Sequence, residues 1–71
     1  MKTFYVTFGV SSVLRNVILC VQADSRDVVI DTMKRKEGCA YFCDAYQWDE
    51  KTAVAKASIW HATIVDGGII E

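Results

Sequence analysis

The sequence predicts one α+β domain spanning residues 1–71, a small antiparallel or mixed β-sheet in the order β-β-α-β-(α)-β with one main helix packed on one face. Three observations support this fold class. Apolar and polar residues alternate strictly over residues 2–8, a capped amphipathic segment begins at Asp24-Ser25, and a glycine-rich turn signal lies at 66–68. A chain of 71 residues leaves no room for a second domain.

The second strand is predicted over residues 14–22, after a turn at 9–12. Its apolar residues fall on both faces, with Val17, Leu19 and Val21 on one face and Ile18 and Cys20 on the other. A strand that is apolar on both faces is typical of the interior of a sheet, or of a strand covered by a partner.

The main helix begins after Asp24 or Ser25, because either side chain can accept a hydrogen bond from the first helical turn. Val29, Ile30 and Met33 recur at helical spacing and form its expected buried stripe. A third strand is predicted to follow over residues 39–46.

The segment 48–58 allows two interpretations. Asp49 could cap a helix through the alanine-rich residues that follow it, or it could lie in a hairpin turn before a long fourth strand. We favour a short helix, followed by a strand over residues 58–65. The Asp66-Gly67-Gly68 segment then predicts a tight turn, from which residues 69–70 pair back as a short stub.

Composition restricts the partners and the compartment. Hydrophobic residues make up 52% of the chain, more than one small core is expected to bury, so we expect a homo-oligomer. The net charge of −1 gives no basic footprint, so no DNA partner is expected. No apolar run is long enough for a membrane span, and three cysteines, an odd number, suggest reduced thiols. These features predict a cytoplasmic protein.

Catalytic chemistry finds little support. His61 is the single histidine, and no serine is placed as its nucleophile, so we expect no enzyme, no cofactor and no metal. Two alternatives remain open on the residue types. One is a thiol enzyme that pairs His61 with Cys20, Cys39 or Cys43, and the other is a zinc site formed by Cys39, Cys43 and His61.

Aromatic residues in the second half of the chain are the strongest sign of binding. An aromatic platform with a nearby cation is how proteins hold a base or a nucleotide, although aromatic residues also fill cores and anchor interfaces. The candidate ligand or interface residues are Arg15, Tyr41, Tyr46, Trp48, Trp60 and His61.

The N-terminal half resembles a group of small phage and prophage proteins. The resemblance rests on the opening Lys2–Gly9 strand of the KxFYVTFG type, the Leu14-Arg15-Asn16 turn and the Ala23-Asp24 helix start, and it covers about the first 38 residues. It implies an accessory protein of a phage or mobile element that works inside a bacterium, in the cytoplasm of the bacterial host, and it assigns no catalytic residues.

Together these features predict a non-enzymatic binding protein that acts against host defence. It would either sequester a signalling nucleotide or block a host defence protein. The alternative is a homo-oligomeric structural or interaction module without a small-molecule ligand, in which the aromatic residues only make subunit contacts.

Overall fold

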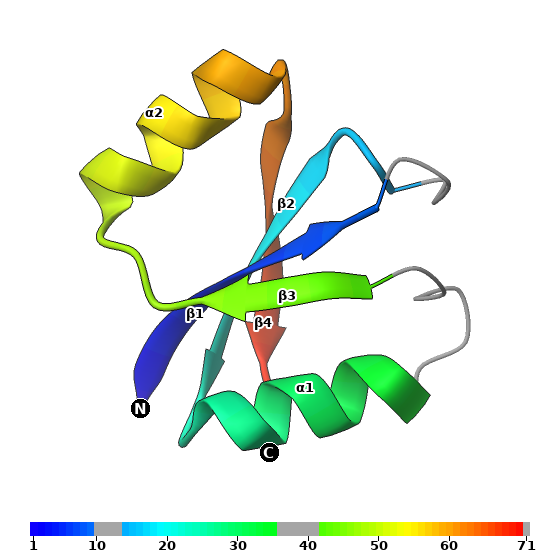
Figure 1. The fold of residues 1–71 in the computed structure, drawn as a ribbon. Helices are drawn as coiled ribbons and strands as arrows, with labels where there is room; N and C mark the ends of the chain where they lie inside the picture. The colour runs from blue at the N-terminus through cyan, green and yellow to red at the C-terminus, as the bar shows by residue number, and fades with distance from the viewer. Residues whose placement is uncertain (10–13, 36–41, 71) are drawn as a thin grey trace.

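The computed structural model describes residues 1–9, 14–35 and 42–70 (Figure 1). The described residues form six elements: β1 (Lys2–Phe8), β2 (Val17–Ala23), α1 (Arg26–Arg35), β3 (Phe42–Tyr46), α2 (Glu50–Trp60) and β4 (Thr63–Ile69). The predicted strand at 2–8 is confirmed. The second strand begins three residues later than predicted. The chain turns over residues 14–16, where Val17 N–H donates to the Leu14 carbonyl at 2.9 Å.

The four strands form one mixed sheet in the order β3-β1-β2-β4, so the predicted α+β class is confirmed. β1 runs antiparallel to both β2 and β3, whereas β4 pairs in parallel with β2. The connection through α1 crosses the sheet from β2 to β3, and the connection through α2 crosses back from β3 to β4. Two crossovers of the same hand that run in opposite directions place their helices on opposite faces. Figure 1 shows α1 and α2 on opposite sides of the sheet.

The alternation of β1 separates two cores. Phe4 and Val6, which are 1% and 0% exposed, point toward α1 and join Val29 and Met33 of that helix. Tyr5 points the other way and packs with α2. The alternation in the sequence therefore marks a strand buried on both faces.

The first residues of α1 hold the helix to the sheet. The Ser25 hydroxyl accepts from Val28 N–H at 3.4 Å, in agreement with one of the two predicted caps. The Arg26 guanidinium donates to the Ala45 carbonyl at 3.0 Å and forms an ion pair with Asp44. The start of α1 is thus bonded to β3 directly.

The ambiguous segment is a helix, and it is longer than predicted. Asp49 caps α2 by accepting from Thr52 N–H at 2.7 Å. Hydrogen bonding from the Thr52 side chain, together with this backbone bond, lowers the pKa of the Asp49 carboxyl. Ala53 and Ala57 are its buried residues, and their small side chains let the helix lie close to the sheet. The predicted strand over residues 58–65 is wrong at its start, because α2 continues through Trp60.

The predicted turn at residues 66–68 is also wrong. These residues lie inside β4, where the pairing with β2 shifts register between Cys20 and Val21, and Ile69 pairs with Gln22. Gly68 has φ +79°, a left-handed conformation suited to glycine, and its N–H donates to the Asp66 carboxylate at 2.9 Å. The turn-like residues therefore build a bulge within a strand.

Gly67 gives a direct test of this packing. A Cβ at Gly67 would lie 2.7 Å from Val21 Cγ1 and 2.8 Å from Leu19 Cγ, well inside contact distance. We expect Gly67→Ala to lower the free energy of unfolding by about 1–3 kcal/mol, because the core must shift to admit the methyl group. Urea unfolding followed by far-UV circular dichroism measures the loss. Val54→Ala, at an exposed position on α2, is the control and should change the free energy of unfolding little. Equal stability of G67A and wild type would contradict the bulge geometry.

Candidate functional site

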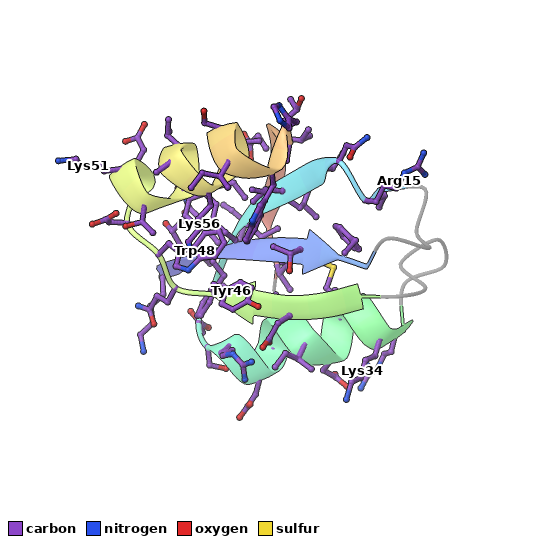
Figure 2. All side chains as sticks on the ribbon, turned by 45° about the horizontal axis from the view of Figure 1, so that its top comes forward. Arg15, Lys34, Tyr46, Trp48, Lys51 and Lys56 are labelled. Carbon is purple, nitrogen blue, oxygen red and sulfur yellow. The ribbon has the colours of Figure 1, made fainter. Side chains whose placement is uncertain are left out.

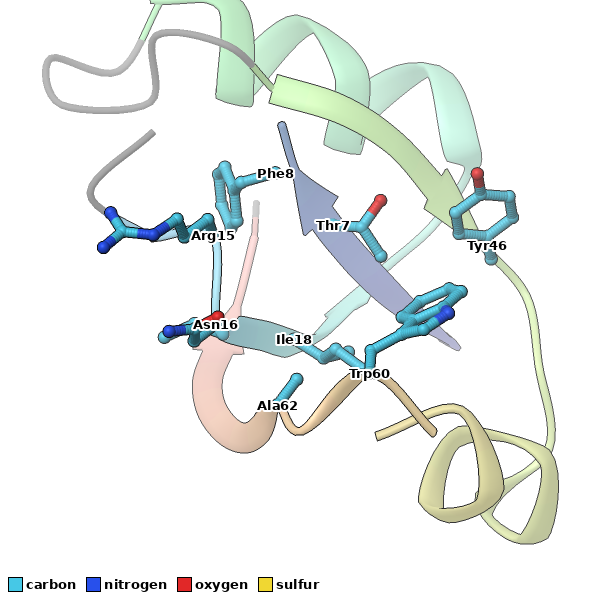
Figure 3. A pocket seen from close by; sticks show the side chains of 9 residues that line it. Thr7, Phe8, Arg15, Asn16, Ile18, Tyr46, Trp60 and Ala62 are labelled. Carbon is cyan, nitrogen blue, oxygen red and sulfur yellow. The ribbon is translucent and has the colours of Figure 1, made fainter. Parts of the chain in front are cut away.

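A pocket of about 470 Å³ opens on the face of the sheet that carries α2. It lies where β1 ends, β2 begins and α2 meets β4, beside the end of β3 (Figure 3). Its lining residues are Thr7, Phe8, Arg15, Asn16, Val17, Ile18, Tyr46, Trp60 and Ala62.

Two distant segments of the chain meet at this pocket. Thr63 N–H donates to the Asn16 carbonyl at 2.9 Å, and this backbone bond begins the parallel pairing of β4 with β2. The bond holds the turn that carries Arg15 beside the end of α2, which carries Trp60. In Figure 3 the Arg15 side chain and the Trp60 indole lie on different sides of the pocket, and the Arg15 guanidinium points away from the indole.

A sharp reversal after α2 makes this meeting possible. His61 adopts φ 53° and ψ 39°, the left-handed conformation that ends many helices. Its N–H donates to the Ser58 carbonyl at 3.4 Å, and Ala62 N–H donates to the Ala57 carbonyl at 2.9 Å. The helix therefore stops within one residue of Trp60, and the chain turns directly into β4.

A cluster of stacked rings supports the wall of the pocket that Tyr46 and Trp60 form. The Trp48 ring lies nearly parallel to Tyr46, with centroids 4.7 Å apart and 6° between the planes (Figure 2). The centroid of the Trp48 ring also lies 6.0 Å from that of Tyr5 and 5.9 Å from that of Trp60. Stacked and tilted ring pairs of this kind add to the stability gained from burial, so Trp48 supports both Tyr46 and Trp60.

Trp60 keeps an accessible surface although it belongs to this cluster. Its side chain is 46% exposed, and the Lys56 ammonium lies 5.7 Å from the centroid of its ring. A cation over an indole face is attracted by the electron density of the ring. Trp60 therefore offers a planar surface next to one cationic residue, Lys56, and a second, Arg15, lies on the other side of the pocket.

The polar groups of the pocket are of the kinds that bind an anion or a hydrogen-bonding ligand. Arg15 contributes a guanidinium, Asn16 an amide, and Thr7 a hydroxyl that also donates to the Asp44 carbonyl at 3.4 Å. Arg15 is the one charged residue among those that line the pocket in the described part of the chain. A guanidinium at one side and aromatic rings at the other suit a ligand with an anionic group and a flat ring.

The structure brings together some of the predicted site residues and separates others. Arg15, Tyr46 and Trp60 line the same pocket, and Trp48 supports it from behind. His61 is exposed and ends α2 instead of lining the pocket. Tyr41 lies outside the described residues. The lining also includes residues that sequence reasoning missed, among them Thr7, Phe8, Asn16 and Ala62, which enter through strand register and carry no motif.

The two alternatives based on cysteine receive no support from the described residues. Within them, no group of three His, Cys, Asp or Glu side chains is placed to hold a metal ion. Cys39 and the side chain of Cys43 lie outside the described part. Cys20 is a partly buried free thiol beside Tyr5 on the α2 face. Among the helices described, none is long and apolar enough to cross a membrane.

No protein-family model, no curated protein and no solved structure matches this chain.

Tyr5 links the ring cluster to the stability of the fold. Burial raises the pKa of its hydroxyl above the usual value of 10.0, and the neighbouring Cys20 thiol raises it further. The folded protein thus holds the Tyr5 proton more tightly than the unfolded chain does. Its contribution to stability is fully present below about pH 10 and is lost as the pH rises through the folded-state pKa.

A Tyr5→Phe variant tests this linkage. We expect the free energy of unfolding of wild type to fall more steeply above about pH 10 than that of Y5F, which has no proton to lose at this position. Urea titrations of both proteins between neutral and alkaline pH give the two curves. Subtracting one curve from the other cancels the titration of the other tyrosines and the lysines, which both proteins share. Parallel curves would contradict the prediction.

Proposed function

We propose that this protein is a non-enzymatic binding protein that holds a nucleotide in the pocket between Arg15 and Trp60. In this proposal Trp60 and Tyr46 contact the base, and Arg15 binds the phosphate. The wider role, sequestration of a signalling nucleotide against host defence, rests on the resemblance of the first half of the chain to small phage and prophage proteins.

The observation that carries the proposal is the shared pocket of Arg15 and the supported aromatic wall. Stacking of a base on an aromatic side chain contributes about 1–3 kcal/mol, and it tolerates different bases. A guanidinium adds a charge-assisted, bidentate contact to a phosphate. Because Trp48 fixes Tyr46 by stacking at 4.7 Å, the wall loses little conformational freedom when a base binds.

The size of the pocket agrees with this ligand class. Its volume of about 470 Å³ lies toward the lower part of the range of roughly 300–1,000 Å³ that small-molecule sites occupy. One guanidinium in the lining favours a ligand with few phosphates over a densely charged triphosphate.

Arg15 and Trp60 variants test the proposal. Native mass spectrometry of protein purified gently from bacterial cells gives the mass of any retained ligand, and titration of a panel of nucleotides with a thermal-shift readout gives affinities. We expect Arg15→Gln and Trp60→Leu each to weaken nucleotide binding about tenfold or more, which corresponds to at least 1.4 kcal/mol.

Arg35→Gln is the matched control for Arg15. Arg35 lies on α1, where it pairs with Asp31 at 2.8 Å, and it is absent from the pocket lining. R35Q is expected to bind like wild type. If no nucleotide shifts the melting temperature of wild type, or if R15Q and R35Q bind equally well, the proposal is wrong.

A second candidate function is a homo-oligomeric interaction module. The observation in its favour is the number of exposed large apolar residues on α2, where Val54 is 55%, Ile59 69% and Trp60 46% exposed. In that case Trp60→Ala would weaken self-association, measured by sedimentation velocity, while R15Q would leave the assembly and every nucleotide titration unchanged. An assembly that W60A does not alter would exclude contacts through this surface.

A further inference from the structure

The two edges of the sheet differ in how their backbone groups are bonded. At the β3 edge, Ala45 N–H donates to the Asp44 carboxylate at 2.8 Å, and the Ala45 carbonyl accepts from Arg26 at 3.0 Å. The ion pair between Arg26 and Asp44 closes this arrangement. Side chains therefore occupy the outward backbone groups of Ala45, through which another strand would pair at this point of the edge.

The β4 edge has a different pattern. Thr63 N–H donates inward to the Asn16 carbonyl at 2.9 Å. Because N–H and C=O groups alternate in direction along a strand, those of Ile64 and Asp66 point outward, away from β2. In the described part of the chain no strand lies on that side of β4. Val65, between them, is 42% exposed and faces the α1 side of the sheet, opposite Ile64.

We propose that a second copy of this chain pairs with the β4 edge, antiparallel and with the two-fold axis at Val65. In this register Ile64 of each copy pairs with Asp66 of the other, and the outward groups of both residues form backbone hydrogen bonds. The two Val65 side chains lie opposite each other at the axis, in a pair where side chains approach closely. The proposal is independent of the nucleotide pocket.

Charge placement favours this register and this occupant. Asp66 is the only charged residue of β4 (Thr63–Ile69), and in the Val65 register it faces Ile64 of the other copy. A register centred on Asp66 would place two carboxylates opposite each other, which is destabilising. A two-fold interface uses the same surface of both subunits, so β4 of each copy supplies one side of this interface.

The side-chain bonds to Ala45 hinder pairing at the β3 edge, so we expect assembly to stop at two chains. A sheet with two open edges can add copies without limit, whereas a sheet with one open edge closes as a dimer. The two-fold axis is perpendicular to the joined sheet, so both copies of α2 lie on one face and both copies of α1 on the other.

A lysine at Val65 tests the interface. Wild type, measured by sedimentation velocity at rising concentration, is expected to reach twice the mass of one chain. Val65→Lys places two ammonium groups opposite each other at the axis, and we expect it to weaken the dimer about tenfold or more. Gln47→Lys, at an exposed position between β3 and α2, is the matched control and should dimerise like wild type. Circular dichroism checks that both variants are folded.

A cysteine at the same position gives an independent readout. Opposed residues in such a pair have Cα atoms about 4.5 Å apart, within the range that a disulfide spans. Mild oxidation of Val65→Cys should give a covalent dimer on a non-reducing gel, in clear excess over wild type and Gln47→Cys, which share the native cysteines. A protein that is monomeric at every concentration, or a dimer that V65K leaves intact and V65C does not cross-link, would overturn the proposal.

Discussion

The structure depends on the burial of both faces of β1. This strand is hydrogen-bonded on each side, to β2 and to β3, and its side chains alternate between the two cores. Full burial of a large apolar side chain such as Phe4 contributes about 1.5–3 kcal/mol, a large share of the stability of a chain this short. Each helix is needed to keep one face of β1 from water. The second helix can lie close only because Ala53 and Ala57 occupy its buried face.

Local patterns predicted the elements that local chemistry determines. The strand at residues 2–8 and the helix that begins after Ser25 followed from alternation and capping, and both are present. The end of the chain could not be predicted in the same way. Asp66-Gly67-Gly68 has the composition of a hairpin turn, but it lies in a strand because β4 pairs in parallel with the distant β2. Gly67 is required there by the side chains of Leu19 and Val21, which no local pattern reveals.

The candidate site shows the same division. Residue type was enough to single out Arg15, Tyr46 and Trp60, because cations and aromatic rings are the groups that bind nucleotides. Their position in one pocket depends on the order of the strands in the sheet, which local sequence patterns do not predict. His61 was singled out for its imidazole, yet its place in the fold follows from its left-handed backbone at the end of α2. Thr7 and Asn16 join the pocket through register alone.

The pocket and the β4 edge are two consequences of one register. The hydrogen bond from Thr63 to Asn16 brings the Arg15 turn beside Trp60, and the alternation that begins there turns the backbone of Ile64 outward. A slip of one residue would move Ile64 out of its core and Val65 into it, and would also exchange the inward and outward backbone groups. The bulge at Gly67 and Gly68 then adds one residue to β4. Because of it Ile69, rather than Gly68, pairs with Gln22, and Ile70 N–H donates to the Gln22 carbonyl at 2.7 Å. The two glycines therefore act on the far half of β4, while the bond at Thr63 sets the half that carries both the pocket and the proposed dimer axis.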